Sequence, residues 1–197
     1  MKLLALRCPQ CAQPLHPQYD ETILTGCRSC QAIVAMDERG VRQVNVPFAT
    51  PRGDIGPQPV AWVPFWVFTG TVQITRRQKQ GGSSGAAEEA RALWSRVEKL
   101  YMPGWELPVP AARELGSMLV QTQPAWQPLA EPPGVALQEL TVTKEDALKL
   151  LEFVAITIEA ERQDWLRDIQ FTIETSRATV WFVPARENGR SWQLLTA

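Results

Sequence analysis

The sequence is poor in the residues that most enzyme active sites use. It contains a single histidine, His16, and only four cysteines among 197 residues. Nucleophilic catalysis of the Ser-His-Asp or Cys-His kind needs a histidine base beside the nucleophile. The phosphate-binding patterns G-x-x-x-x-G-K-[ST] and G-x-G-x-x-G are also missing. We therefore predict that the protein is not an enzyme and has no catalytic residues.

Long apolar runs and a strong excess of one charge are missing as well. No apolar run approaches the roughly 20 residues of a membrane-spanning helix, and the short run Leu3–Leu6 ends at Arg7, which does not fit a secretory signal. The net charge is −1, and residues 1–45 hold five basic and four acidic side chains, whereas nucleic-acid-binding domains usually concentrate basic residues. The sequence predicts a cytoplasmic protein without membrane contact.

All four cysteines lie in the first thirty residues, as the pairs Cys8/Cys11 and Cys27/Cys30. Each pair encloses two residues, and fifteen residues separate the pairs, a spacing typical of tetrahedral metal sites. Each pair follows an apolar or β-prone run, which favours a metal site over a redox disulfide at the start of a helix. Four thiolates suit zinc or iron, and the short connector favours zinc. Reduced thiols also fit the predicted cytoplasmic location.

With two cysteine knuckles set between short β-prone runs, residues 1–46 resemble a zinc ribbon. The resemblance implies a small β-hairpin module that holds a structural zinc through its four cysteines. Many ribbons place glycine after the second cysteine of a knuckle, where the backbone is left-handed, but Ala12 and Gln31 occupy those positions here. His16 is predicted to be a surface residue, because four thiolates already close the site.

The remaining sequence predicts a second domain over residues 60–197, joined by a Pro/Gly-rich linker or draped loop over residues 47–59. A strand is predicted over 60–77, broken near Gly70. Apolar residues recur at helical spacing from Ala90 to Tyr101, over 111–120, and over 144–163, where the apolar stripe continues to Trp165. Two strands near 169–174 and 180–184, followed by an Asn-Gly turn at 188–189, predict an antiparallel meander.

These elements predict an α+β fold: an N-terminal zinc ribbon and a domain with an antiparallel sheet packed by two main helices. The basic cluster 76–79 and the carboxylate pairs 159/161 and 164/168 are interpreted as solvated side chains. The leading hypothesis is a non-enzymatic adaptor with structural zinc that binds another protein; exposed Trp62 and Trp66 would favour it. The alternatives are nucleic-acid binding through the ribbon and an enzyme with an unrecognised site in the proline-rich segment 103–134.

Overall fold

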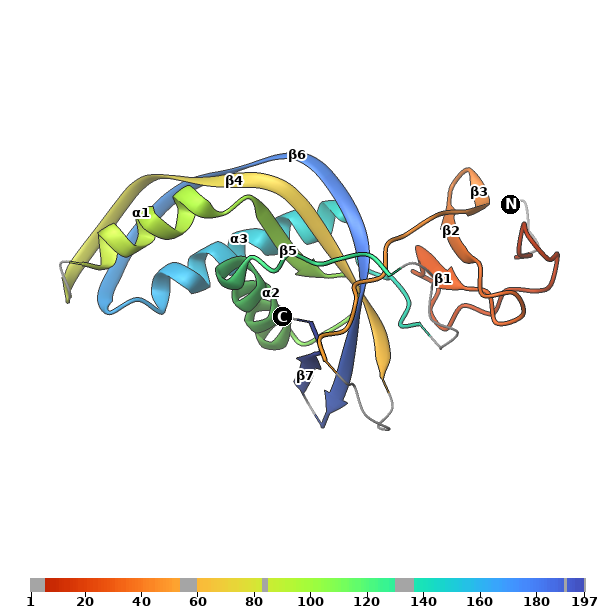
Figure 1. Cartoon of the computed structure of the whole chain (residues 1–197). Coiled ribbons are helices and arrows are strands. Elements are labelled where there is room, and N and C mark those ends of the chain that lie inside the picture. The colour runs from red at the N-terminus through yellow and green to blue at the C-terminus, as the bar shows by residue number, and fades with distance from the viewer. Residues whose placement is uncertain (1–5, 54–59, 83–84, 130–136, 190, 197) are drawn as a thin grey trace.

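The computed structural model describes residues 6–53, 60–82, 85–129, 137–189 and 191–196. The chain forms two antiparallel sheets and three helices (Figure 1), so the predicted α+β class is confirmed. The small sheet, in the order β1-β2-β3, consists of β1 (Leu24–Gly26), β2 (Ile33–Asp37) and β3 (Gly40–Gln43). The large sheet, in the order β5-β4-β6-β7, consists of β4 (Ala61–Gly82), β5 (Lys99–Pro103), β6 (Asp164–Asn188) and β7 (Ser191–Leu194).

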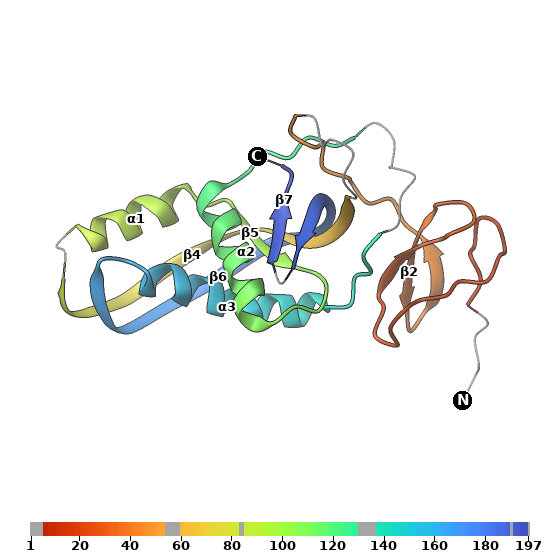
Figure 2. The ribbon, with the colours of Figure 1, turned by 90° about the horizontal axis from the view of Figure 1, so that it is seen from below.

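Three helices cover the concave side of the large sheet: α1 (Ala86–Arg96), α2 (Val109–Thr122) and α3 (Lys144–Ala160). β4 and β6 run side by side as a long curved pair, and the small sheet lies beside the half of this pair that is farther from α1 (Figures 1 and 2). The Thr143 hydroxyl caps α3 by accepting a hydrogen bond from the Asp146 N–H at 3.1 Å. No helix in the described part of the chain is long and apolar enough to cross a membrane.

The predicted helix between Ala90 and Tyr101 is only half correct. α1 ends at Arg96, Val97 adopts an extended backbone, and the following residues form β5 against β4. Leu100, Tyr101 and Met102 are all buried, so β5 is apolar on both faces. A strand buried on both faces shows no alternation of apolar and polar residues in its sequence. The apolar residues of β5 therefore matched the helical spacing of α1 by chance.

The two predicted C-terminal strands are one continuous strand. β6 runs from Asp164 to Asn188 and pairs with β4 along most of its length. Trp165, which the sequence assigned to the apolar stripe of α3, lies instead in β6 and is 73% exposed. The Asn188-Gly189 turn into β7 is confirmed, with Gly189 at a φ of 67°.

Gly70 allows β4 and β6 to change register without separating. The pairing shifts between Thr69 and Gly70, and a Cβ on Gly70 would lie 2.2 Å from the backbone oxygen of Glu174. We expect Gly70→Ala to lower the free energy of unfolding by about 1–3 kcal/mol, because backbone must move to admit the methyl group. Chemical denaturation measures this, with Thr71→Ala on the exposed neighbour as the control. Equal stability of the two variants would show that the β4–β6 backbone adjusts to the added methyl group without loss of stability.

Candidate metal centre and its attachment to the second domain

The two cysteine knuckles have the same backbone structure. In the first, the Cys8 N–H donates to Gln13 O and the Cys8 carbonyl accepts from the Ala12 N–H, at 2.9 and 2.8 Å. In the second, Cys27 makes the same two bonds with Ala32 and Gln31, both at 2.8 Å. The repeated backbone structure indicates that the two cysteine pairs have the same role.

Ala12 and Gln31 occupy the left-handed positions of the knuckles. Their φ angles are 60° and 63°, so they adopt the backbone conformation that glycine usually supplies in a zinc ribbon. A non-glycine residue is modestly strained in this left-handed conformation. The departure from the glycine pattern therefore leaves the knuckle geometry intact.

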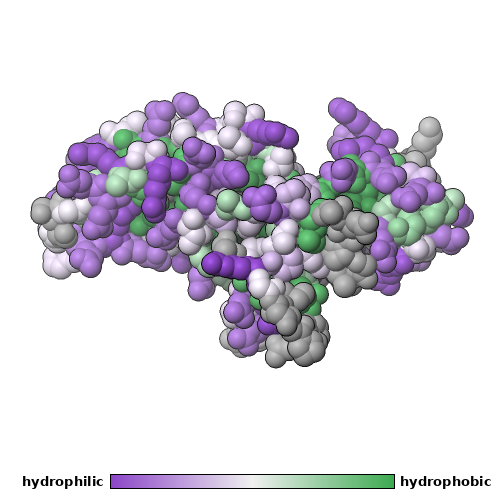
Figure 3. Space-filling view, viewed as in Figure 1, coloured by the Kyte–Doolittle hydropathy of each residue, from purple (hydrophilic) through white to green (hydrophobic). Residues whose placement is uncertain are grey.

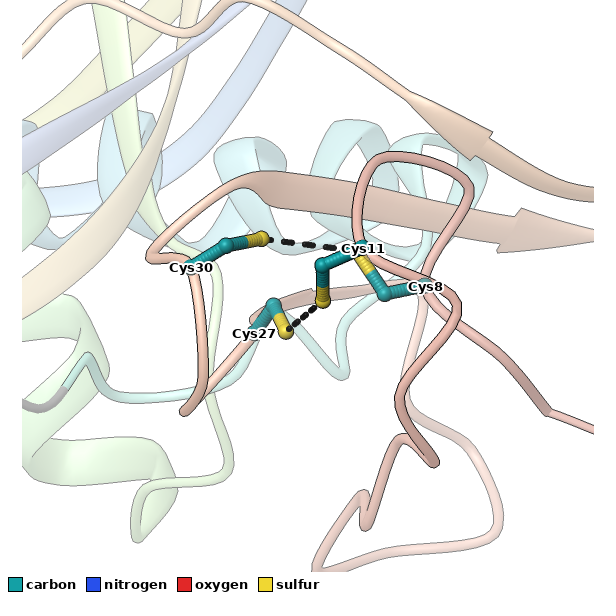
Figure 4. A group of neighbouring side chains, drawn as sticks. All are labelled: Cys8, Cys11, Cys27 and Cys30. Carbon is teal, nitrogen blue, oxygen red and sulfur yellow. Dashed lines mark hydrogen bonds between the residues drawn. The ribbon is translucent and has the colours of Figure 1, made fainter.

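The knuckles bring all four sulfurs together (Figure 4). The four Sγ atoms lie within 4.8 Å of one another, with Cys8 to Cys30 at 3.6 Å and Cys11 to Cys27 at 3.7 Å. All four cysteines are free thiols. Four thiolates about 2.3 Å from a zinc ion at the centre of a tetrahedron would be separated by roughly 3.8 Å. The sulfur spacing therefore fits a tetrahedral metal ion.

Charge repulsion among the sulfurs gives a second reason for a cation. Burial raises the pKa of the Cys27 thiol, but the N–H groups of Cys30 and Ser29 outweigh it and bring that pKa to about 7. At Cys30 the Ala32 N–H favours the thiolate, yet burial and the neighbouring sulfurs raise the pKa to about 12. Cys27 and Cys30 therefore do not both ionise near neutral pH unless a cation balances them.

Other polar residues near the cluster stay outside it. His16 is exposed and is not a member of the sulfur cluster. Arg7 is exposed and donates to the Ala12 carbonyl at 3.1 Å, which ties the N-terminal segment to the first knuckle. Among the described residues, the candidate metal ligands are therefore these four sulfurs.

Comparisons with known proteins yield no relative. No family model matches the chain, and neither the curated proteins nor the solved structures contain a significant match. The function must therefore be argued from this chain's own geometry.

Residues 6–46, which contain the cysteines, are here called the N-terminal module. One short segment connects this module to the second domain. Residues 137–142 pair on one side with β4, where the Gln138 N–H donates to Trp62 O at 2.9 Å. On the other side the Leu140 N–H donates to Leu24 O in β1 at 3.0 Å, and Leu140 O accepts from Ile23 at 2.7 Å. The small sheet is thus extended by a segment of the second domain.

A buried carboxylate secures this connection. Glu139 is 4% exposed, and its oxygens accept from the Gln18 N–H at 2.9 Å and from the hydroxyls of Thr22 and Thr25 at 2.5 and 2.9 Å. All three donors belong to the N-terminal module. Hydrogen bonds to an ionised group are among the stronger ones, so Glu139 holds the module in one orientation.

The junction also has a hydrophobic core of its own. Its buried residues come from the module, the strap that follows it (residues 47–53), segment 137–142 and the large sheet: Leu24, Ile33, Val46, Phe48, Trp62, Leu140 and Phe182. The rings of Phe48 and Phe182 stack at 5.1 Å between centroids. Trp62 is therefore buried here, and Trp66 is half-buried with its indole N–H bound to Val142 O at 2.9 Å. The exposed pair of tryptophans considered from the sequence is not formed.

Replacing Glu139 with glutamine tests this attachment. Glu139→Gln keeps the size but turns one acceptor oxygen into an NH2 donor, and we expect the free energy of unfolding to fall by about 1–3 kcal/mol because at least one of the three donors loses its acceptor. Hydrogen exchange at Thr22 and Thr25 should accelerate more than exchange within β4. Glu38→Gln, on the exposed turn between β2 and β3, is the control. Unchanged exchange at both threonines would argue that the hydrophobic core alone holds the module.

A second charged cluster lies at the far end of the large sheet. Arg77 in β4 forms a two-pronged ion pair with Asp164 and donates to Glu159 Oε2 at 2.8 Å. Glu159 also accepts from Trp94 Nε1 and Arg162 Nε, both at 2.9 Å. Both carboxylates are buried, at 0% and 3% exposure, so the sequence interpretation of solvated acids is wrong for them. Two arginines balance two acids, and the cluster joins the end of α3 to the β4–β6 pair.

Proposed function

We propose that the protein is a non-enzymatic, zinc-stabilised module that binds another protein. In this proposal the N-terminal module is a zinc ribbon whose zinc is structural and is held by Cys8, Cys11, Cys27 and Cys30. The attachment of this module to the second domain carries the proposal. Segment 137–142, Glu139 and the junction core join the two parts into one surface, so a metal that shapes one part also shapes the combined surface.

Closure of the metal site supports a structural role. Catalytic zinc keeps an open coordination position, whereas four thiolates fill a tetrahedron. Two of the buried carboxylates of the second domain, Glu159 and Asp164, face arginines, and a third, Glu139, accepts three hydrogen bonds from the N-terminal module. Neither cluster offers a poised acid or base, which supports binding rather than catalysis.

Charge distribution favours a protein partner over nucleic acid. The module carries few basic residues, and one of them, Arg42, lies 3.5 Å from the Asp37 carboxylate. A generic phosphate-binding surface would need a denser basic face. Nucleic-acid binding through the ribbon remains the second candidate and is separated by its salt dependence, because counterion release gives phosphate binding a steep salt slope.

Affinity capture with matched variants tests the proposal. The zinc-loaded full-length protein is immobilised and exposed to a nuclease-treated extract of its source cells, and captured proteins are then purified and titrated against it. We expect a partner that binds the wild type and His16→Ala but not Cys27→Ser/Cys30→Ser. Absence of any directly binding protein, with retention of a 20-nucleotide RNA or DNA that falls steeply with salt, would establish the nucleic-acid alternative instead.

A further inference from the structure

A groove of about 670 Å³ lies between the N-terminal module and the large sheet, here called the junction groove. One wall consists of module and strap residues that include Ala35, Arg42 and 44–47, and the other consists of the β6 residues 177–181 with parts of β4 and β5. In Figure 3 hydrophobic surface is visible where the module meets the second domain. Three cationic residues line the groove: Arg177 on β6, Arg42 on β3, which also lies 3.5 Å from Asp37, and Lys99 on β5 across the sheet. No acidic residue is among the described lining.

The β6 strand presents an open edge to this groove. β4 pairs with one edge of β6, and β7 covers the other edge only between Ala185 and Asn188. Next to β7 the strap takes over: the Phe182 N–H donates to Pro47 O at 3.0 Å, and Phe182 O accepts from the Ala49 N–H at 2.8 Å. The chain therefore already adds one of its own extended segments to this edge.

Strand geometry fixes which groups come next along the edge. Successive residues of a strand direct their N–H and C=O groups to alternate sides, so Val180 and Ala178 point the same way as Phe182, away from β4. Within the described residues no backbone partner is found for either of them. Both residues also belong to the lining of the junction groove. Two donors and two acceptors are therefore arrayed along the β6 edge, beside the groove, at the spacing of a strand.

The opposite edge of the same sheet is protected. The Gln123 side chain accepts from the Lys99 N–H at 3.1 Å and donates to the Lys99 carbonyl at 2.8 Å, so it occupies the outer edge of β5. Proteins usually shield sheet edges, since an unshielded edge is a template for another strand. The contrast between the two edges marks the β6 edge as a docking position.

We propose that an extended, acidic segment of a partner protein binds in the junction groove by adding a strand to β6 beside Ala178 and Val180. Main-chain hydrogen bonds to these two residues supply affinity, and alternate side chains supply specificity. Acidic side chains of the segment meet Arg177 and Arg42, while its apolar side chains contact Val180 and Val46. The inference rests on the protein-binding function proposed above and specifies its surface and its ligand.

Charge separates this occupant from the other candidates for the edge. A second copy of the chain, paired edge to edge through β6, would bring two sets of the same three cations together. A like-charge arrangement of this kind disfavours a homodimer. Nucleic acid would satisfy the cations but has no amide groups for the β6 backbone, so it leaves the edge unpaired.

Direct titration of a defined peptide tests the inference. The probe is a fluorescein-labelled eight-residue peptide of alternating valine and glutamate, compared with the same design in valine and lysine and with a 20-nucleotide single-stranded DNA. We expect the acidic peptide to bind at least about tenfold more tightly than the basic one, equivalent to about 1.4 kcal/mol. The amides of Ala178 and Val180 should become protected from hydrogen exchange in the complex.

Two variants and their controls make the outcome decisive. Arg177→Glu should weaken peptide binding by about tenfold or more, whereas Arg167→Glu, exposed on the same strand outside the groove, should leave it within about twofold. Ala178→Pro removes an outward N–H without touching the β4 pairing, and it should abolish binding while thermal unfolding remains near that of the wild type. If that variant does not fold, Arg177→Glu and the exchange measurement decide.

Other results would overturn the inference. Binding of neither peptide, tighter binding of the DNA with a steep salt slope, or a concentration-dependent dimer in sedimentation would each assign the edge to a different occupant or to none. Failure here is distinguishable from failure of the proposed function. If the captured protein partner binds wild type, Arg177→Glu and Ala178→Pro equally well, the function stands and the groove is not its site.

Discussion

We expect that removing the proposed metal with a chelator unfolds residues 6–46 and leaves the large sheet and its helices folded. Apparent binding free energies of structural zinc in small modules are about 10–16 kcal/mol at pH 7, so a module of this size depends on the ion. Its own buried core, apart from the junction, consists of little more than Cys8, Leu15, Cys27, Ala32 and Val34. Hydrogen exchange read by mass spectrometry should show full loss of protection over the module.

The second domain should respond to metal removal only at the junction. Trp62, Phe48 and Phe182 lose the cover of Leu24 and Ile33, so exchange rises at the start of β4 and the melting temperature of the domain falls. Readdition of zinc restores both regions, and Cys27→Ser/Cys30→Ser without chelator serves as the matched metal-free control. Iron or oxidised cysteines in protein purified without added metal would contradict a structural zinc.

Arg77→Met lowers the free energy of unfolding by about 3–5 kcal/mol. The Arg77 side chain is 10% exposed, and its removal leaves Asp164 without its main partner and Glu159 with one fewer donor. Removing one partner of a buried pair strands an uncompensated charge, which costs far more than the pair itself contributes. Urea denaturation followed by tryptophan fluorescence measures the change.

The adjacent arginine is a matched control. Arg76 lies 3.4 Å from Asp168, but both side chains are about half exposed. Solvent-exposed ion pairs contribute about 0–1 kcal/mol, so Arg76→Met should be nearly neutral. Similar effects of the two substitutions would show that residues 76–79 act through general charge rather than through the buried cluster.

Acid titration provides a second readout of the same cluster. The hydrogen bonds and charge of Arg77 hold the pKa of Asp164 below its usual value of 3.8, despite burial. A lowered folded-state pKa adds stability at any pH above the unfolded value, and that stability is lost as the pH falls through the folded pKa. The wild type should therefore lose this contribution below about pH 4, a step that Arg77→Met lacks because its pKa shift is gone.

The sequence predicted what depends on local pattern. Cysteine spacing identified the sulfur cluster, the apolar repeat over 144–163 located α3, and Asn188-Gly189 located the last hairpin. In each case the residues that decide the structure are close together in the chain, and their geometry follows from helical periodicity or turn chemistry.

Long-range contacts were beyond reach of such patterns. Glu139 contacts Thr22 across 117 residues, and nothing around Glu139 in the sequence distinguishes it from a surface glutamate. Glu159 and Asp164 lie beside Arg162, which favoured solvated partners, yet their main partner is Arg77, more than eighty residues earlier. Whether an acidic side chain is buried depends on the partner that the tertiary structure places beside it. Charged residues are rarely buried without such a partner.

The pairing of β4 with β6 has a consequence for the order in which the chain folds. Ala61 lies opposite Ala185, so the large sheet cannot close until nearly the whole chain is available. Contacts this distant in sequence make folding slow, because a long loop must close before they form. The cysteine knuckles need only the first 32 residues. During synthesis the sulfur cluster, and the metal proposed for it, can thus assemble first, and the module docks later, once β4, Leu140 and Phe182 can form the junction core.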